Sequence, residues 1–168
     1  FDRLITAFSV ATARGLKARL VIAGGGPERE RLDRLIVTYG MSERIQLAGY
    51  CEPPRLRAFM QAADLQVCTS VFENLSLAIL EGMACGTPVL GTPGGGTPEL
   101  VAQIDQALVL ADDHPHTLAD ALPVWLADVD RLGALGRRAR ALAVERYDWE
   151  RVVDGLETVC GEVASEWH

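Results

Sequence analysis

The sequence predicts an α/β domain, with a Rossmann-like parallel sheet that carries helices on both faces. Short runs of strand-forming residues alternate with longer segments of helical periodicity, the order that parallel sheets with crossover helices produce. The strand-like runs are mostly aliphatic or β-branched, as strands covered on both faces should be. A glycine cluster directly follows the first of these runs, where such a fold turns from strand to helix.

Five strands and eight helices are expected along the chain. The strands are predicted at residues 19–23, 44–48, 65–69, 88–91 and 107–110. Helical patterns fill the gaps and the C-terminal third, at residues 1–14, 28–39, 53–62, 76–85, 98–103, 115–128, 131–146 and 149–166. The first helix is amphipathic from Phe1 to Phe8, and the last carries an apolar stripe from Val152 to Val163.

Strands stop after the polar segment at residues 111–115, and helices dominate from there on. We therefore expect residues 1–111 to form the Rossmann-like core and residues 112–168 to complete the same domain. Packing of the last helix on its own sheet and contact with another domain are both compatible with its apolar stripe.

Length and composition limit the classes of protein to consider. The chain has 168 residues, of which 49% are apolar, enough for one globular domain with a core. Its net charge of −7 disfavours non-specific electrostatic binding to nucleic acid. The four cysteines lack CxxC spacing and predict reduced thiols in a cytoplasmic protein. No apolar stretch approaches the length of a membrane span, so no integral membrane segment is expected.

The glycine cluster Gly24-Gly25-Gly26 lies between a predicted strand and a helix that begins near Pro27. Glycines let the backbone approach a ligand closely, and a helix N-terminus offers unpaired amides to an anion. Arg29 replaces the third glycine of a GxGxxG motif, and no P-loop lysine follows. The cluster is therefore either a tight turn or a ligand contact.

The strongest constellation runs from Asp64 to Glu99. A predicted strand ends near Ser70, a loop carries Glu73, and a helix with Ser76 as its expected N-cap carries Glu81. In a parallel sheet this is the carboxyl edge, where ligands bind. Both glutamates could be ordinary surface acids. Glu81, however, lies in an almost wholly apolar helix, and a buried carboxylate needs a partner, which favours a functional role.

These residues resemble the signature of retaining glycosyltransferases of the group 1 class (family 4), which have the GT-B fold. Glu73 is followed after seven residues by Glu81, and then by the run Gly82-Met83-Ala84-Cys85-Gly86-Thr87-Pro88-Val89. The similarity extends to the segments Gly24–Pro27, Ala63–Leu65, Gly95–Glu99 and Arg146–Trp149. It covers about residues 1–155, and the combined order of motifs is specific although no single piece is.

The resemblance implies a role for each matching residue. Glu81 would hold the ribose hydroxyls of a nucleotide-sugar donor, and Glu73 would contact the donor sugar near the reacting carbon. The remaining donor-binding residues would be Asn74, Leu75, Ser76, Leu77, Gly24, Gly25, Gly26, Tyr50, Cys51 and Ser70. Ser76 stands where the family's motif has glycine, which changes the sugar contacts.

The resemblance also implies a partner domain. In the family, a central strand with an Arg and a Lys that clamp the diphosphate precedes the segment that resembles Phe1–Phe8. This chain would therefore be the C-terminal, donor-binding half of a GT-B enzyme, inactive alone, without the first central strand. The N-terminal domain would supply the acceptor site, and any peripheral membrane contact at the inner face of the membrane would be made through it.

The implied reaction moves a sugar from a nucleoside diphosphate to an acceptor hydroxyl with retention, and needs neither a cofactor nor a metal. Asp128-Val129-Asp130 spells a metal motif of another glycosyltransferase fold, but it lies between two predicted helices. Residues 112–116 favour a polar turn and helix cap over a metal cluster. Residues 137–140 favour a solvated arginine-rich face over a phosphate site.

Two other functions remain open at this point. One is a nucleotide-sugar-binding module without transfer activity, and the other is a GT-B nucleotide-sugar epimerase. The spacing of Glu73 and Glu81, together with the loop Gly95–Glu99, argues against the epimerase. The sugar, the base and the acceptor cannot be read from these residues, because base recognition in the family rests largely on the main chain.

Overall fold

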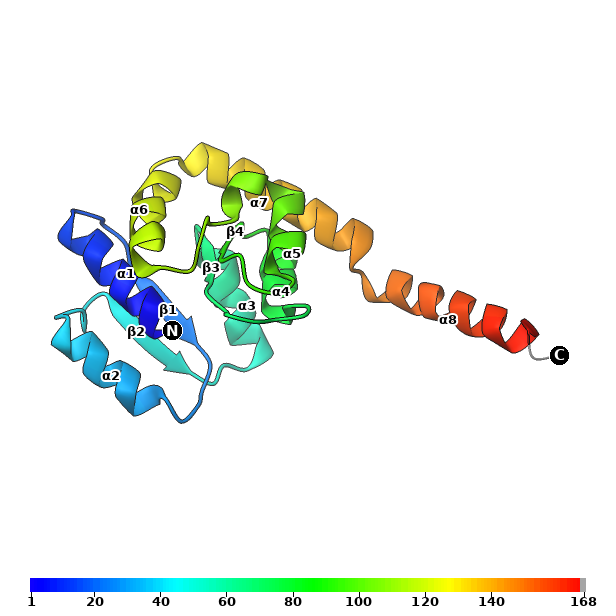
Figure 1. The fold of residues 1–168 in the computed structure, drawn as a ribbon, viewed down its shortest axis with the longest axis horizontal. Coiled ribbons are helices and arrows are strands. Elements are labelled where there is room, and N and C mark those ends of the chain that lie inside the picture. Colours follow the sequence, from blue (N-terminus) through cyan, green and yellow to red (C-terminus); the bar gives the residue numbers. More distant parts are fainter. Residues whose placement is uncertain (167–168) are drawn as a thin grey trace.

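A computed structural model describes residues 1–166 and confirms an α/β fold with parallel strands (Figure 1). The described elements are, in chain order, α1 (Asp2–Ala13), β1 (Leu20–Ala23), α2 (Arg29–Thr38), β2 (Ile45–Gly49), α3 (Pro53–Ala62), β3 (Gln66–Cys68), α4 (Leu77–Cys85), β4 (Val89–Gly91), α5 (Thr97–Ile104), the 3-10 turn η1 (Gln106–Leu108), α6 (Pro115–Leu126), α7 (Val129–Arg146) and α8 (Trp149–Glu166). The eight predicted helices and the first four predicted strands are confirmed, and no end differs from its prediction by more than two residues.

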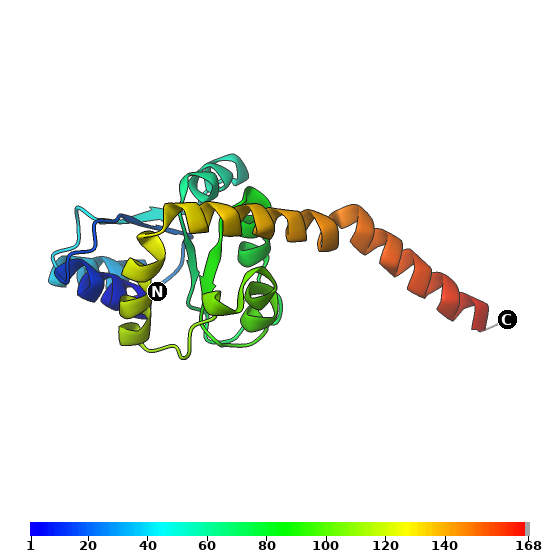
Figure 2. The ribbon, with the colours of Figure 1, turned by 90° about the horizontal axis from the view of Figure 1, so that it is seen from above.

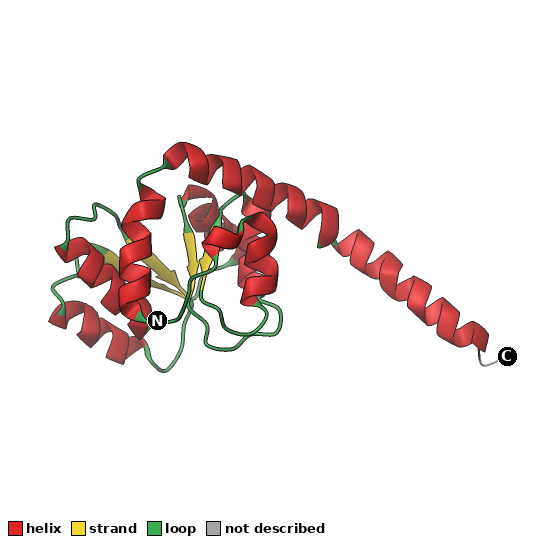
Figure 3. Cartoon of the chain, turned by 45° about the horizontal axis from the view of Figure 1, so that its top comes forward, coloured by secondary structure: helices red, strands yellow, loops and turns green. Residues whose placement is uncertain are grey.

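The strands form two parallel pairs. Leu20 is opposite Ile45 in the β1–β2 pair, and Gln66 is opposite Val89 in the β3–β4 pair. Within residues 1–166 no ladder joins the two pairs, which lie apart in the middle of the domain (Figure 3). Val21 of β1 is 39% exposed although it lies in a strand. Within the described part of the chain, the strand edges between the two pairs have backbone groups without a ladder partner.

The fifth predicted strand, residues 107–110, is wrong. Gln106–Leu108 form the 3-10 turn η1, and within residues 1–166 the strand pairing of this segment is limited to a bridge between Val109 and Gly91 of β4. The Asp105 carboxylate accepts a hydrogen bond from the amide of Ala107 at 2.9 Å. This local bond stabilises the turn. It also engages the amide of Ala107, the first residue of the apolar run, whose composition would otherwise favour an extended strand.

The helices cover the strands and pack on one another. α1 lies beside α6, and α4 packs against α3 and α7 (Figure 1). Residues with no exposed surface lie on α1, α4, β4, α5, η1, α6 and α7, and include Ile5, Ile79, Met83, Leu90, Ile104, Leu108, Ala119 and Ala139. Helices α6 and α7 therefore share one core with the strands.

Helix α8 differs from the others because it extends away from the domain (Figure 2). Its side chains are exposed over residues 149–165, including Trp149 at 77% and Leu156 at 59%. The amphipathic pattern predicted for this helix is present, but its apolar stripe packs on nothing within residues 1–166. None of the helices in that range combines the length and hydrophobicity needed to cross a bilayer.

Candidate functional site

Two loops meet at the carboxyl edge of the β3–β4 pair. The first runs from the end of β3 to α4 and carries Glu73, and the second runs from the end of β4 to α5 and carries Gly94–Gly96. Because β3 and β4 are parallel neighbours, their following loops leave the sheet side by side. This is the place where the sequence predicts the sugar-donor site.

Side chains in the first loop are held by hydrogen bonds. The hydroxyl of Ser70 donates to Oε1 of Glu73 at 2.8 Å. The hydroxyl of Thr92, from the second loop, donates to the carbonyl of Ser70 at 3.1 Å. Thr92 is only 3% exposed and Ser70 is partly buried, so this bond is partly sheltered from water. The Glu73 carboxylate is thus connected through Ser70 to the end of β4.

The second loop lies directly against the backbone of the first. The amide of Gly96 donates to the carbonyl of Glu73 at 2.6 Å. A Cβ atom on Gly94, Gly95 or Gly96 would come within 2.5 Å, 2.1 Å and 2.0 Å, respectively, of a carbonyl oxygen in residues 71–74. All three positions therefore need glycine for this close approach, and Gly95 also has a positive φ of 56°.

Sequence reasoning missed this second loop as part of the site. Thr92 was not predicted as a site residue, and Gly95 and Gly96 entered only as part of a resemblance. The available signal was the three consecutive glycines Gly94–Gly96, which follow the predicted strand of residues 88–91 after two intervening residues, whereas Gly24–Gly26 follow their predicted strand directly.

Helix α4 begins where the sequence predicts, but without a side-chain cap. Ser76 is the N-cap residue with an extended backbone, φ −82° and ψ 106°, and its side chain makes no capping hydrogen bond. The amides of the first turn have no intrahelical partners in any α-helix. The α4 N-terminus, adjacent to Glu73, therefore offers both amides and the positive end of the helix dipole.

The expected burial of Glu81 is wrong, because this residue is exposed. The inward face of α4 carries Ile79 and Met83, each with no exposed surface, whereas Leu77 on the outward face is 67% exposed. Glu81 lies one turn after Leu77, on that outward face. Because nearly all residues of α4 are apolar or glycine, its sequence does not indicate which face is buried. Glu81 is exposed, so the free-energy cost of burying a carboxylate gives no argument for a functional role.

A second group of predicted residues gathers at the carboxyl ends of β1 and β2. The amide of Gly24 donates to the carbonyl of Gly49 at 2.8 Å, and these residues have positive φ of 127° and 69°. A Cβ on Gly25 would be 3.8 Å from the amide nitrogen of Tyr50. Tyr50 is 74% exposed, whereas Cys51 is 8% exposed and its thiol donates to the carbonyl of Gly49 at 3.5 Å.

The structure thus brings the predicted site residues together in two groups. Ser70, Glu73 and the start of α4 form one, and the glycine turn with Tyr50 and Cys51 forms the other. Both groups lie at carboxyl ends of parallel strands, but no hydrogen bond within residues 1–166 joins them. Binding of one ligand by both groups stays a prediction.

The acidic sequences near the C-terminal helices have structural roles. Asp128 caps α7 by accepting a hydrogen bond from the amide of Arg131 at 2.9 Å. Asp112 accepts one from the amide of His114 at 2.9 Å. Hydrogen bonds from the Thr117 hydroxyl and from this amide hold the pKa of Asp112 below its usual value. The predicted polar turn is therefore confirmed, whereas His114, the N-cap residue of α6, makes no side-chain capping hydrogen bond.

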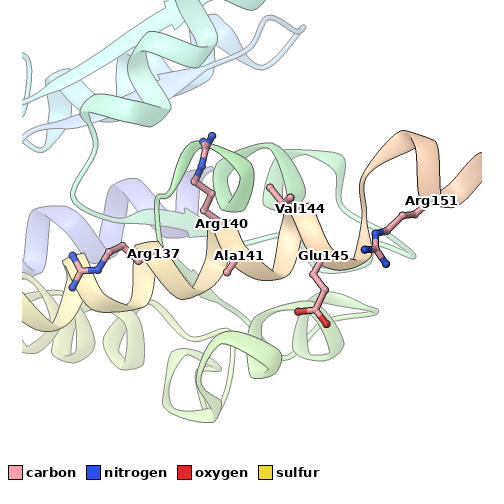
Figure 4. Close-up of a pocket in the computed structure, with 6 residues that line it drawn as sticks. All are labelled: Arg137, Arg140, Ala141, Val144, Glu145 and Arg151. Carbon is pink, nitrogen blue, oxygen red and sulfur yellow. The ribbon is translucent and has the colours of Figure 1, made fainter.

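The arginine-rich face of α7 also anchors α4. Arg140 donates to the carbonyl of Ala84, near the end of α4, at 2.7 Å. Arg137, Arg140 and Arg151 help to line an open hollow of about 470 Å³ between α7 and α8 (Figure 4). Glu145 lies in the same hollow, and none of the predicted sugar-donor residues lines it.

The fold, with its loops at the carboxyl ends of parallel strands, is that of one half of a GT-B glycosyltransferase. A sucrose-phosphate synthase from Thermosynechococcus elongatus is similar to this chain with a TM-score of 0.86 and 25% identity, over 98% of this chain and 43% of that one. Anabaena HepE in complex with UDP-glucose is similar in fold, with a TM-score of 0.80 and 24% identity, over 97% of this chain and 44% of that one.

Residues 1–142 match the family described as glycosyl transferases group 1, and the chain belongs to this family. A D-inositol 3-phosphate glycosyltransferase of Nocardia farcinica is 34% identical over 159 residues, which cover 92% of this chain and 35% of that protein. A GDP-mannose-dependent phosphatidylinositol monomannoside mannosyltransferase of Mycobacterium tuberculosis is 31% identical over 162 residues, 92% of this chain and 42% of that protein. The chain thus spans less than half the length of these relatives.

Proposed function

We propose that this chain is the sugar-donor-binding half of a retaining glycosyltransferase. The complete protein would move a sugar from a nucleoside diphosphate to an acceptor hydroxyl. The observation that carries the proposal is the Glu73 carboxylate, held by Ser70 in the loop that leads directly into the N-terminus of α4. Relatives support the class of donor, since one is described as GDP-mannose-dependent and HepE as a complex with UDP-glucose.

In this proposal each group at the site takes one part of the donor. The diphosphate accepts hydrogen bonds from the amides of residues 74–77, where the helix dipole favours an anion. Glu73 positions the sugar, and Glu81 accepts hydrogen bonds from the ribose hydroxyls. The exposure of Glu81 suits this role, because a ligand lying on the outward face of α4 could reach its carboxylate.

The chemistry follows from where charge develops. As the glycosidic bond to phosphate breaks, the sugar becomes oxocarbenium-like and positive while the leaving diphosphate becomes more negative. The carboxylate of Glu73 stabilises the first charge and the α4 amides stabilise the second. We assign no nucleophile to the enzyme; the acceptor hydroxyl attacks from the face that the diphosphate leaves, and the leaving phosphate takes its proton. No metal ion or cofactor enters this proposal.

The proposal includes a second domain that binds the acceptor. We also propose that a strand outside these 168 residues pairs with the strand edges between the β1–β2 and β3–β4 pairs, which have no ladder partner within residues 1–166. The apolar stripe of α8 would pack on the second domain. A cytoplasmic location, expected from the four free cysteines, stays a prediction.

Binding and release of nucleotide test the proposal on the complete protein. We expect UDP or GDP to raise the melting temperature in a concentration-dependent way, because a ligand that binds only the folded state stabilises it. Incubation with UDP-glucose and with GDP-mannose should then release one nucleoside diphosphate faster when sugar acceptors are added. Binding without release would favour a nucleotide-sugar-binding module, and the absence of both would contradict the proposal.

Replacing Glu81 with Ala should weaken nucleotide binding and change turnover much less. Hydrogen bonds to a charged group contribute roughly 1.5–3 kcal/mol, so we expect the Kd for the nucleoside diphosphate to rise about 10- to 100-fold. Titration calorimetry measures this Kd. The matched control is Glu145→Ala, which also removes an exposed helical glutamate and should leave the Kd unchanged. An unchanged Kd in Glu81→Ala would remove the ribose-binding role.

A further inference from the structure

The orientation of the Glu73 carboxylate depends on a neighbouring hydroxyl. The end torsion of a glutamate side chain has no sharp minimum, so packing or hydrogen bonds must select its direction. Here the Ser70 hydroxyl donates to Oε1 of Glu73 at 2.8 Å, and both residues are partly buried. One carboxylate oxygen is therefore engaged by Ser70, while Oε2 has no hydrogen-bond partner within residues 1–166.

Ser70 is itself held from the next strand. Thr92, the first residue after β4, donates through its hydroxyl to the carbonyl of Ser70 at 3.1 Å. The amide of Thr92 donates to the carbonyl of Cys68, the last residue of β3, also at 3.1 Å. Thr92 therefore binds two carbonyl groups, that of Cys68 at the end of β3 and that of Ser70 in the first loop. Thr92 itself is buried, with 3% of its surface exposed.

The backbone of Glu73 is held from the same side. Its carbonyl accepts a hydrogen bond from the amide of Gly96 at 2.6 Å, and the close approach of Gly95 leaves no room for a side chain there. The backbone and the carboxylate of Glu73 are thus both positioned, the first by the glycine loop and the second by Ser70. A displacement of about 1 Å in a reacting group can cost roughly 100-fold in rate.

We propose that Ser70 and Thr92 are positioning residues for Glu73, an inference that rests on the proposed function. Ser70 acts through the carboxylate of Glu73 and does not bind the sugar donor itself, in contrast to the donor-binding role that the resemblance implies. Thr92 acts one step further away, by holding the carbonyl of Ser70. The position of Ser70 thus depends on Thr92, and the position of the Glu73 carboxylate depends on Ser70.

A double-mutant cycle on the complete protein tests this order. The readout is release of UDP from UDP-glucose and of GDP from GDP-mannose, with kcat and KM determined for Ser70→Ala, Thr92→Val, Glu73→Gln and the double variants. We expect Ser70→Ala to lower kcat roughly 10- to 100-fold while the KM for the sugar donor changes less than about 3-fold. In the Glu73→Gln background the same change should cost less than about 2-fold, because the group it positions is already disabled.

Two further variants separate positioning from folding. Ser70→Thr keeps the hydroxyl and should retain most of kcat. Ser9→Ala is the matched control, because the Ser9 hydroxyl also makes one partly buried bond, to the carbonyl of Thr6 at 2.8 Å, but lies on α1. It should leave kcat and KM unchanged. A raised KM with unchanged kcat in Ser70→Ala, or losses that multiply in the double variant, would overturn the proposal.

A crystal structure of the Ser70→Ala protein gives a readout that does not need activity. We expect the Glu73 side chain to adopt a second conformation or to lose its defined position. A Glu73 carboxylate that keeps its place in this variant would overturn the positioning role, whether or not the protein transfers sugars. If the unaltered protein neither binds UDP or GDP nor releases them from the donors, the proposed function fails instead.

Discussion

Replacing Glu73 with Gln in the complete protein is expected to lower kcat roughly 100- to 1,000-fold, while affinity for the nucleoside diphosphate changes little. The magnitude is that of removing one preorganised electrostatic contact to a transition state. Gln has almost the same shape, and its side-chain oxygen can still accept the hydrogen bond from Ser70. The loop should therefore keep its geometry, and the effect should come from the lost negative charge.

Steady-state release of UDP or GDP from the sugar donor measures kcat, and calorimetry with the nucleoside diphosphate measures affinity. The matched control is Glu145→Gln on α7, an exposed glutamate outside the proposed sugar-donor site, which should behave like the unaltered protein. If Glu73→Gln weakens nucleotide binding and keeps kcat, while Glu81→Ala lowers kcat and keeps binding, the roles assigned to the two glutamates are wrong.

The second large effect is on stability, where α7 crosses the end of α4. Gly136 lies so close to this crossing that a Cβ atom would be 2.1 Å from the carbonyl oxygen of Gly86. Gly86 ends α4 in the left-handed conformation, with φ 82°, so it cannot shift easily. We expect Gly136→Ala to lower the free energy of unfolding by about 2 kcal/mol, because overpacking outweighs the better helix propensity of alanine.

Chemical unfolding of the complete protein, followed by circular dichroism, measures this change. Gly133→Ala is the matched control, since it lies in the same helix and its Cβ would meet only a nitrogen of Arg137 at 3.6 Å. There alanine should raise the free energy of unfolding by up to about 1 kcal/mol. Equal stability of the Gly133→Ala and Gly136→Ala proteins would contradict the close α4–α7 contact.

Local features of the chain were predictable. The helix of residues 53–62 begins with two prolines, which suit a first turn, and the structure places α3 at these residues. The run Leu20–Ala23 is aliphatic and ends at glycine, and it forms β1. The wrong prediction of a strand at residues 107–110 also has a local cause. The Asp105 carboxylate accepts a hydrogen bond from the amide of Ala107, and this bond outweighs the strand preference of a short apolar run.

The candidate site was only partly predictable. Glu73 and its loop follow from the motif, but Thr92 contacts Ser70 across 22 positions of sequence and only because β3 and β4 are neighbours. The exposure of Glu81 also depends on tertiary contacts, since every other residue of α4 is apolar or glycine and the composition does not show which side meets α7. Neither feature has a periodic signal in the sequence.

The amino-acid sequence by itself determined the α/β class, the order of the elements and the residues that mark the family, because propensity, periodicity and motif spacing act over short stretches of chain. Only the tertiary structure decided which loops touch, which face of α4 is open and where glycine is obligatory. Those features come from packing between segments far apart along the chain, whose close approach no local preference specifies.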